Sequence, residues 1–380
     1  MPVYLDHAAS TPVRPEAIEA MLPFLAEHPG NPSGAHAASR ATKNALEEAR
    51  ETVAAAFGVE PRNIVFTGGG SEGDNLAVKG AAWAARARRP DLDRVVTTGI
   101  EHKAVLGACA RLEREGFGVA RIAATSAGTV DLDALASALD ERTAVVSVML
   151  VNNETGIRQP LDAVATLVRD RAPNAVLHTD AVQAPQWLDL RVAARTADCV
   201  AISGHKFGGP KGVGALVVRD GVALTPLIEG GGHERDLRAG TQNVAGIVAF
   251  ATALRITDAR RGDERARITA LRDRLAVGIG ATPNGDTAQR VEGILHCAFE
   301  GVEAETLLVA LDQQGVYAAS GSACTSGAID PSHVLLAMGM PRERALSSVR
   351  FSLGYASTDA DIDEALRVVP EVVAKLRASS

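Results

Sequence analysis

The sequence predicts an α/β protein with a largely parallel sheet, because strand-like apolar segments alternate with helical patterns. The predicted strands are short, often β-branched and bounded by Gly, Asp or Asn, and they cover residues 63–67, 94–98, 144–150, 175–179, 199–203 and 213–218. Apolar residues at helical spacing predict helices over 37–56, 71–88 and 103–115. Polar residues follow several of the strands, and open α/β sheets bind ligands at that edge.

A second unit is expected toward the C-terminus. A charged helical stretch at 251–279 leads into residues 294–380, which have strand and helix patterns of their own. The length of 380 residues also suits two or three structural units, at about 150 residues per domain.

Composition excludes several classes of function. The formal net charge is −7, and the basic residues are scattered, which argues against a nucleic-acid-binding surface. No apolar run is long enough to predict a membrane span, and the N-terminal segment lacks the pattern of a signal peptide. The four cysteines form no CxxC pair and have no metal-ligand spacing, so we expect no metal site. We therefore expect a cytoplasmic protein with reduced cysteines.

Two consecutive predicted strands end in residues suited to an aldehyde cofactor. Lys206 follows the strand at 199–203 and could form a Schiff base there, although most lysines in such a position are only solvated. Asp180 ends the preceding strand and could pair with a protonated pyridine nitrogen, or simply cap the following helix. Gln183 lies one helical turn further on and could reach the ring hydroxyl. The lysine and the aspartate together favour pyridoxal 5′-phosphate (PLP).

A glycine-rich turn at 67–72 connects a predicted strand to a predicted helix. Such a turn offers backbone N–H groups and the positive helix end to a phosphate, although many are only tight connections. Gly70 and Ser71 are the candidate phosphate contacts, and Ser203 and His205 could supply further donors.

With these pieces in place, the sequence resembles the cysteine desulfurases of the class V aminotransferase group, in the NifS/IscS-like branch. The matching segments occur in family order over nearly the whole chain and are residues 4–12, 30–33, 64–67, 101–106, 151–154, 178–183, 202–212, 230–235, 320–326 and 350–354.

The resemblance implies the aspartate-aminotransferase-like fold of PLP-dependent transferases. A large PLP-binding domain would cover residues 15–250, and a smaller α+β domain would combine 1–14 with 251–380 and carry the loop of a catalytic cysteine. The family also implies a homodimer with active sites near the subunit interface.

The resemblance also assigns roles to individual residues. Lys206 would form the Schiff base, Asp180 would pair with the pyridine nitrogen, and Gln183 would contact the ring hydroxyl. His102 would stack on the ring and take part in proton transfer; without the motifs it would be an ordinary histidine at a helix start. The remaining implied contacts are Gly70, Ser71, Ser203 and His205 to the phosphate, Thr241 to the phosphate from the other subunit, and Asn153 and Arg350 to the substrate carboxylate, with Asn153 also near the cofactor.

One cysteine decides the reaction that the resemblance implies. Cys324 lies in a small polar run at 319–327, which predicts a mobile surface loop, whereas Cys109, Cys199 and Cys297 lie in apolar segments typical of a core. The implied reaction takes sulfur from L-cysteine, releases L-alanine and leaves a persulfide on Cys324. An acceptor protein would then take the sulfur, such as an iron–sulfur scaffold, a tRNA-thiolation enzyme or a DNA-modification protein.

Three alternatives stay open at this point. A class V aminotransferase would share the PLP residues but need no loop cysteine. A selenocysteine lyase would differ in its preferred substrate. An inactive scaffold in a sulfur-transfer complex would not need Lys206, Asp180, His102 and Cys324 together.

Overall fold

The central sheet has seven strands, and within the described residues all but one run in the same direction. The computed structural model describes residues 2–321 and 330–379. In spatial order the strands are β2 (Ile64–Thr67), β8 (Gly214–Val218), β7 (Cys199–Ser203), β6 (Val176–Asp180), β5 (Thr143–Ser147), β3 (Arg94–Thr98) and β4 (Gly118–Ile122). Only β8 is antiparallel to its neighbours. The prediction of a mainly parallel α/β sheet is therefore confirmed.

Six of these strands were predicted from the sequence, and β4 was missed. β4 lies at the edge of the sheet and its first four residues are partly or fully exposed, so it lacks the apolar run of a central strand. The predicted strand at 144–150 ends early, at Ser147, where the chain leaves the sheet toward a cavity.

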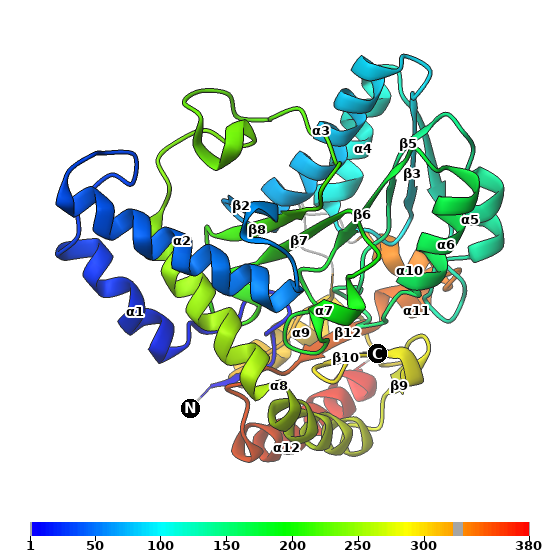
Figure 1. The fold of residues 1–380 in the computed structure, drawn as a ribbon. Helices are drawn as coiled ribbons and strands as arrows, with labels where there is room; N and C mark the ends of the chain where they lie inside the picture. Colours follow the sequence, from blue (N-terminus) through cyan, green and yellow to red (C-terminus); the bar gives the residue numbers. More distant parts are fainter. Residues whose placement is uncertain (1, 322–329, 380) are drawn as a thin grey trace.

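Helices cover both faces of the sheet (Figure 1). Alternate residues of each strand point to opposite faces, so Val145 packs with one group of helices and Val146 with the other. One face is covered by α3 (Gly70–Arg88) and α4 (Lys103–Arg114). Packed against the other face are α2 (Ala37–Phe57), α5 (Leu132–Ala138), α6 (Leu161–Arg171), α7 (Leu190–Ala193) and the first part of α8 (Val244–Gly278).

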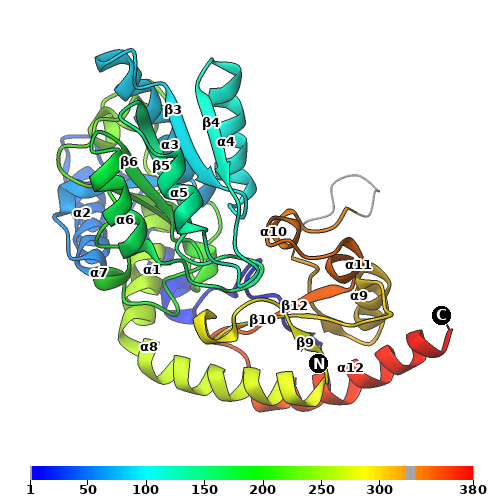
Figure 2. The same ribbon diagram turned by 90° about the vertical axis from the view of Figure 1, so that its right-hand side faces the viewer.

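A second, antiparallel sheet lies apart from the first (Figure 2). Its central strand is β10 (Ile294–Ala298), between β9 (Thr282–Pro283) and β12 (Ser348–Ser352). The N-terminal strand β1 (Val3–Tyr4) pairs in parallel with β11 (Val316–Tyr317) in the same region. The other helices are α1 (Pro15–Ala26), α9 (Ala304–Gln313), α10 (His333–Ala337), α11 (Arg342–Leu346) and α12 (Asp359–Ser379), and single 3₁₀ turns cover Pro61–Asn63, Gly204–Lys206, His233–Asp236 and Thr287–Gln289.

The long helix α8 connects the two regions and runs beside α12 (Figure 2). It begins at Val244, earlier than the predicted start at 251, because Asn243 caps its first turn and Gly246 packs against Val213. The domain boundary predicted after residue 250 falls inside this helix and stays a prediction.

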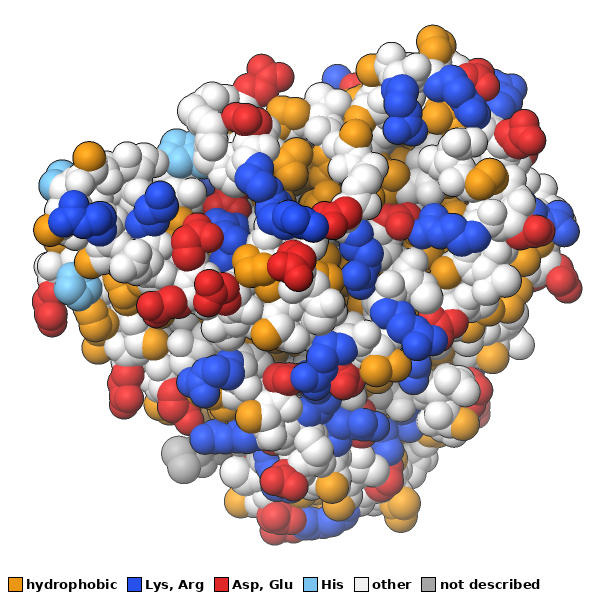
Figure 3. Space-filling view, in the orientation of Figure 1, with side chains coloured by type: hydrophobic (Ala, Val, Ile, Leu, Met, Phe, Trp, Pro, Cys, Tyr) orange, Lys and Arg blue, Asp and Glu red, His pale blue; other side chains and the backbone are white. Residues whose placement is uncertain are grey.

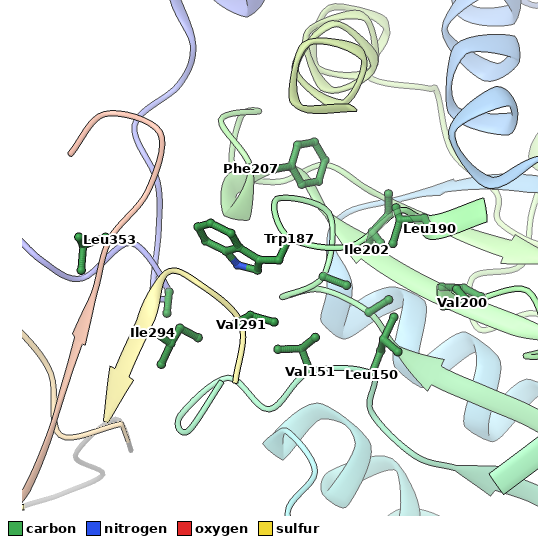
Figure 4. Close-up of a cluster of buried hydrophobic side chains, with 14 of the residues drawn as sticks. Leu150, Val151, Trp187, Leu190, Val200, Ile202, Phe207, Val291, Ile294 and Leu353 are labelled. Atoms are coloured by element: carbon green, nitrogen blue, oxygen red, sulfur yellow. The ribbon is translucent and has the colours of Figure 1, made fainter. Parts of the chain in front are cut away.

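A buried tryptophan fixes the two sheets relative to each other. Trp187 follows β6 and points between residues of the large sheet and Ile294, Val291 and Leu353 of the second region (Figure 4). Gly293 leaves room for the indole, since a Cβ there would lie 2.2 Å from Trp187 Cζ2. This packing holds β12 opposite the ends of the central strands.

On the face that Figure 3 shows, basic and acidic side chains are interspersed. Among the described helices, none combines the length and apolarity needed to span a bilayer.

Candidate active site

A cavity of about 720 Å³ lies between the carboxyl ends of the central strands and the second sheet. Its volume lies within the range typical of small-molecule sites. Residues from both regions line it, together with the N-terminal segment. The sequence-predicted site residues that line it are Gly70, Ser71, His102, Asn153, Asp180, Gln183, Ser203, His205, Lys206 and Arg350.

One predicted site residue does not line the cavity, and another is not among the described residues. Thr241 is exposed and is not among the residues that line the cavity. Cys324, with its predicted mobile loop, lies outside the described residues, although Gly321 lines the cavity on one flank of that segment.

The turn between β2 and α3 forms an anion cradle at one end of the cavity. Gly69 has φ 142°, which favours glycine, and α3 begins with no side-chain cap on its first N–H groups. Gly70 must also lack a side chain, because a Cβ there would lie 2.6 Å from Val182 Cγ2. The open helix start therefore presents N–H donors and the positive end of α3 to the cavity.

His205 extends this cradle. Its Nδ1 is buried and has no hydrogen-bond partner among the described residues. Burial, helped by Lys206 and Lys211, lowers its pKa to about 4, so the ring is neutral near neutral pH. A neutral imidazole can donate one hydrogen bond to a phosphate without adding a charge.

The floor of the cavity holds a buried carboxylate at the end of β6. Asp180 is 4% exposed, and one of its oxygens accepts a hydrogen bond of 2.9 Å from the Val182 N–H. Burial raises its pKa, and the charges of His102 and Lys206 oppose that rise. Such a carboxylate needs a cationic partner, which a protonated ring nitrogen would supply.

His102 lies close to Asp180 at the start of α4. Its Nδ1 accepts a hydrogen bond from the Ala104 N–H at 3.2 Å and so caps the helix. The neutral ring therefore carries its proton on Nε2. Desolvation of the ring by the surrounding protein lowers the pKa of His102, and the charge of Asp180 opposes this change.

A second buried carboxylate, Asp74, lies behind Asp180. One oxygen of each and one His102 nitrogen fall within 4.8 Å of one another. Asp74 Oδ1 is 3.4 Å from His178 Nε2, and Ser147 Oγ is 2.9 Å from His178 Nδ1. Burial, together with the nearby charges of Asp180 and Glu101, raises the pKa of Asp74 well above its ordinary value.

The candidate lysine follows β7 in a short 3₁₀ turn and points into the cavity. Its Nζ donates to the Ala8 and Ala9 carbonyls at 2.7 and 2.9 Å. Burial and the nearby Arg350 lower the pKa of Lys206 to about 8, although Asp180 and Asp6 act in the opposite sense. About one Lys206 side chain in ten is therefore neutral, and so nucleophilic, at pH 7.

Arg350 enters from β12 on the opposite side. It is 4% exposed, donates from Nη1 to the Asn153 carbonyl at 2.7 Å and from Nη2 to Asp6 Oδ1 at 2.8 Å. Its Nε is buried without a hydrogen-bond partner among the described residues. The guanidinium therefore keeps donors available for an anionic ligand.

Comparisons with known proteins show the family of the chain. The family model for class V aminotransferases matches residues 3–365. This chain belongs to the class V aminotransferase family.

Curated relatives align with this chain over nearly its whole length. It is 42% identical to "Cysteine desulfurase IscS" of Methanosarcina thermophila, over 100% of this chain and 93% of that protein. It is 43% identical to "IscS-like cysteine desulfurase" of Mycobacterium tuberculosis, over 99% of this chain and 98% of that one. The predicted resemblance to NifS/IscS-like cysteine desulfurases is therefore confirmed.

Solved structures give the same result. A "NIFS-LIKE PROTEIN" matches 99% of this class V family member and 100% of its own chain, with a TM-score of 0.92 and 35% identity. "SspA in complex with cysteine" matches 94% of this chain and 100% of its own, with a TM-score of 0.82 and 32% identity.

Sequence reasoning missed several residues that line the cavity of this class V family member. Asp6 contacts Arg350, and Asp74 lies behind Asp180. Glu154 is buried and accepts a hydrogen bond from Ser332, while His333 Nε2 contacts the Glu101 carbonyl at 3.0 Å. Asp6 and Glu154 fall inside the matching motifs, so the signal was present, but no role followed from the motif alone.

Proposed function

We propose that this chain is a PLP-dependent cysteine desulfurase, which converts L-cysteine to L-alanine and leaves the sulfur as a persulfide on Cys324. The observation that carries the proposal is one cavity that joins an anion cradle, a lysine with a lowered pKa, a buried aspartate and an arginine with free donors. Full-length relatives with the name cysteine desulfurase support the choice of reaction.

The residues of the cavity fit PLP. The uncapped start of α3 and the unpartnered Nδ1 of His205 suit a phosphate, and the buried carboxylate of Asp180 suits a pyridinium. When bound, PLP would supply an aldehyde that links to the amino acid and a protonated ring that takes up electrons from the α-carbon.

We assign the cofactor contacts as follows. Lys206 would hold the cofactor covalently, Asp180 would keep its ring nitrogen protonated, and His102 would stack on the ring. The contacts to the phosphate would come from Gly70, Ser71, Ser203 and His205, with Gln183 at the ring hydroxyl and Asn153 nearby. The exposed Thr241 would reach the phosphate of a second subunit, so we propose a homodimer, which sedimentation of the active protein would test.

The substrate and its protons would be handled by the chain itself. Arg350, together with Asn153, would bind the α-carboxylate, because a guanidinium matches a carboxylate in geometry and charge. The Nζ of Lys206 would take the proton from the substrate α-carbon, which its lowered pKa allows near neutral pH. His102, neutral and with its proton on Nε2, would exchange a proton with the substrate.

The sulfur would move in one nucleophilic step. The Cys324 thiolate attacks the substrate sulfur, a disulfide-type S–S bond forms, and the carbon–sulfur bond breaks with its electron pair left on carbon. Protonation of that β-carbon, and return of a proton to the α-carbon from which Lys206 took one, complete alanine. We further propose a cytoplasmic enzyme whose persulfide passes to an acceptor protein, such as an iron–sulfur scaffold or a tRNA-thiolation enzyme.

The test measures alanine release and locates the sulfur taken from L-cysteine. Wild type, Cys324→Ser and the control Cys297→Ala are given L-cysteine, alanine release is measured, and persulfide is located by mass spectrometry. Cys297 is a suitable control because it is fully buried and burial raises its pKa to about 12. We expect Cys324→Ser to bind cofactor normally but to release no alanine, whereas Cys297→Ala stays active. Normal alanine release by Cys324→Ser, or persulfide on another cysteine, would reject the proposal.

A further inference from the structure

Arg350 forms its ion pair through a single N–H···O contact, unlike the buried ion pairs of Arg14 and Arg50. Asp6 accepts from Arg350 through one oxygen and one nitrogen, at 2.8 Å. Arg50 and Arg14, in contrast, each engage both oxygens of their glutamate partners through both terminal nitrogens. A two-oxygen pair occupies one whole edge of a guanidinium, whereas the one-oxygen pair with Asp6 leaves donors free.

The carboxylate of Asp6 is placed by rigid backbone. Asp6 forms a bridge with Ser352, two residues after Arg350 on β12, and the flanking bonds Ser352 N–H to Leu5 O and His7 N–H to Ser352 O measure 2.7 and 3.2 Å. The Tyr4 hydroxyl also donates to the Asp6 carbonyl at 3.1 Å. The anchor and the arginine therefore sit on paired backbone segments, which limits how far the guanidinium can turn.

We propose that Asp6 is a positioning residue that fixes the Arg350 guanidinium so that its free donors receive the α-carboxylate of the amino-acid substrate. The inference rests on the proposed function, since it concerns the same site. An arginine side chain has five N–H donors. Asn153 O and Asp6 Oδ1 take two of them, and the described residues offer no acceptor to the buried Nε.

Asp6 has a second effect, on the charge felt by the lysine. Arg350 lowers the pKa of Lys206 and Asp6 raises it, so Asp6 offsets part of the field of the arginine. The charged or titratable groups that act on Lys206, or on which Lys206 acts, are Asp6, His102, Asp180, His205 and Arg350. Removal of the Asp6 charge should therefore shift the titration of Lys206 to lower pH.

The first experiment measures ligand binding to the PLP-loaded protein. The probes are L-alanine, which has the carboxylate, and L-alaninamide, which does not. We expect Asp6→Ala to weaken alanine binding about tenfold through the loss of orientation, with alaninamide unchanged. Asp6→Asn keeps an oxygen acceptor for Nη2 and should stay within about threefold of wild type. Glu19→Ala, an exposed acid on α1, is the charge control and should bind like wild type.

The second experiment measures the pH dependence of cofactor attachment to the cofactor-free protein. The midpoint for Asp6→Asn should fall below that of wild type, while Glu19→Ala leaves it in place. A merely structural role for Asp6 would not move this midpoint in a protein that still binds alanine.

The outcomes distinguish a failure of the Asp6 inference from a failure of the proposed function. If Asp6→Ala binds alanine as well as wild type, or more tightly, Asp6 does not orient the arginine and the inference fails. If wild type does not discriminate alanine from alaninamide, the carboxylate site itself is wrong. If discrimination and its loss in Asp6→Ala are found but cysteine yields no alanine, the proposed function fails while the positioning role stands.

Discussion

The lowered pKa of Lys206 predicts how fast the cofactor attaches at each pH. Only the neutral amine can attack an aldehyde. With the ordinary pKa of 10.5, about one lysine in 3,000 is neutral at pH 7. With the pKa of about 8 that burial produces, about one in ten is neutral, a gain of about 300-fold.

The assay mixes cofactor-free protein with PLP from pH 6 to 10 and follows the visible absorption of the covalent adduct. The rate should rise about tenfold per pH unit and level off above about pH 8. N-acetyl-lysine, measured with the same PLP solutions, corrects for the titration of PLP itself. Its rate of adduct formation should continue to rise at higher pH, where the Lys206 rate has levelled off. Lys206→Ala should form no covalent adduct. A wild-type rate that climbs in parallel with the reference amine up to pH 10 would refute the reasoning.

Two further predictions concern buried carboxylates. Asp180→Asn should retain covalent cofactor but lose at least about a hundredfold in kcat, since an amide cannot keep the ring nitrogen protonated, and wild-type kcat in this variant would contradict the proposed role. Arg50→Met should lose about 3–5 kcal/mol of unfolding free energy in urea, because Glu234, with a side chain 1% exposed, would keep a buried charge without its partner. Arg62→Met, which breaks an exposed pair, should cost less than about 1 kcal/mol, and equal losses in the two variants would show that burial does not set the cost.

Much of the fold and of the candidate site follows from local sequence. Strands such as Cys199–Ser203 are buried along their whole length, so continuous apolar runs identified them with accurate bounds. Asp180 ends one strand and Lys206 lies in the turn after its parallel neighbour, and parallel strands present their carboxyl ends at one edge. The sequence could not reveal the edge strand Gly118–Ile122, whose pairing depends on a neighbour rather than on its own apolar pattern.

The sequence by itself determined the family, the sheet and the lysine–aspartate pair, because these depend on short-range patterns and on motifs in a fixed order. Only the tertiary structure decided how distant segments meet. Asp6 and Arg350 are separated by 344 residues, yet paired backbone brings their side chains to 2.8 Å. The lowered pKa of Lys206 likewise arises from burial between two sheets and from charges supplied by three separate segments. Burial and electrostatic fields depend on distances in space, and no local pattern along the chain encodes them.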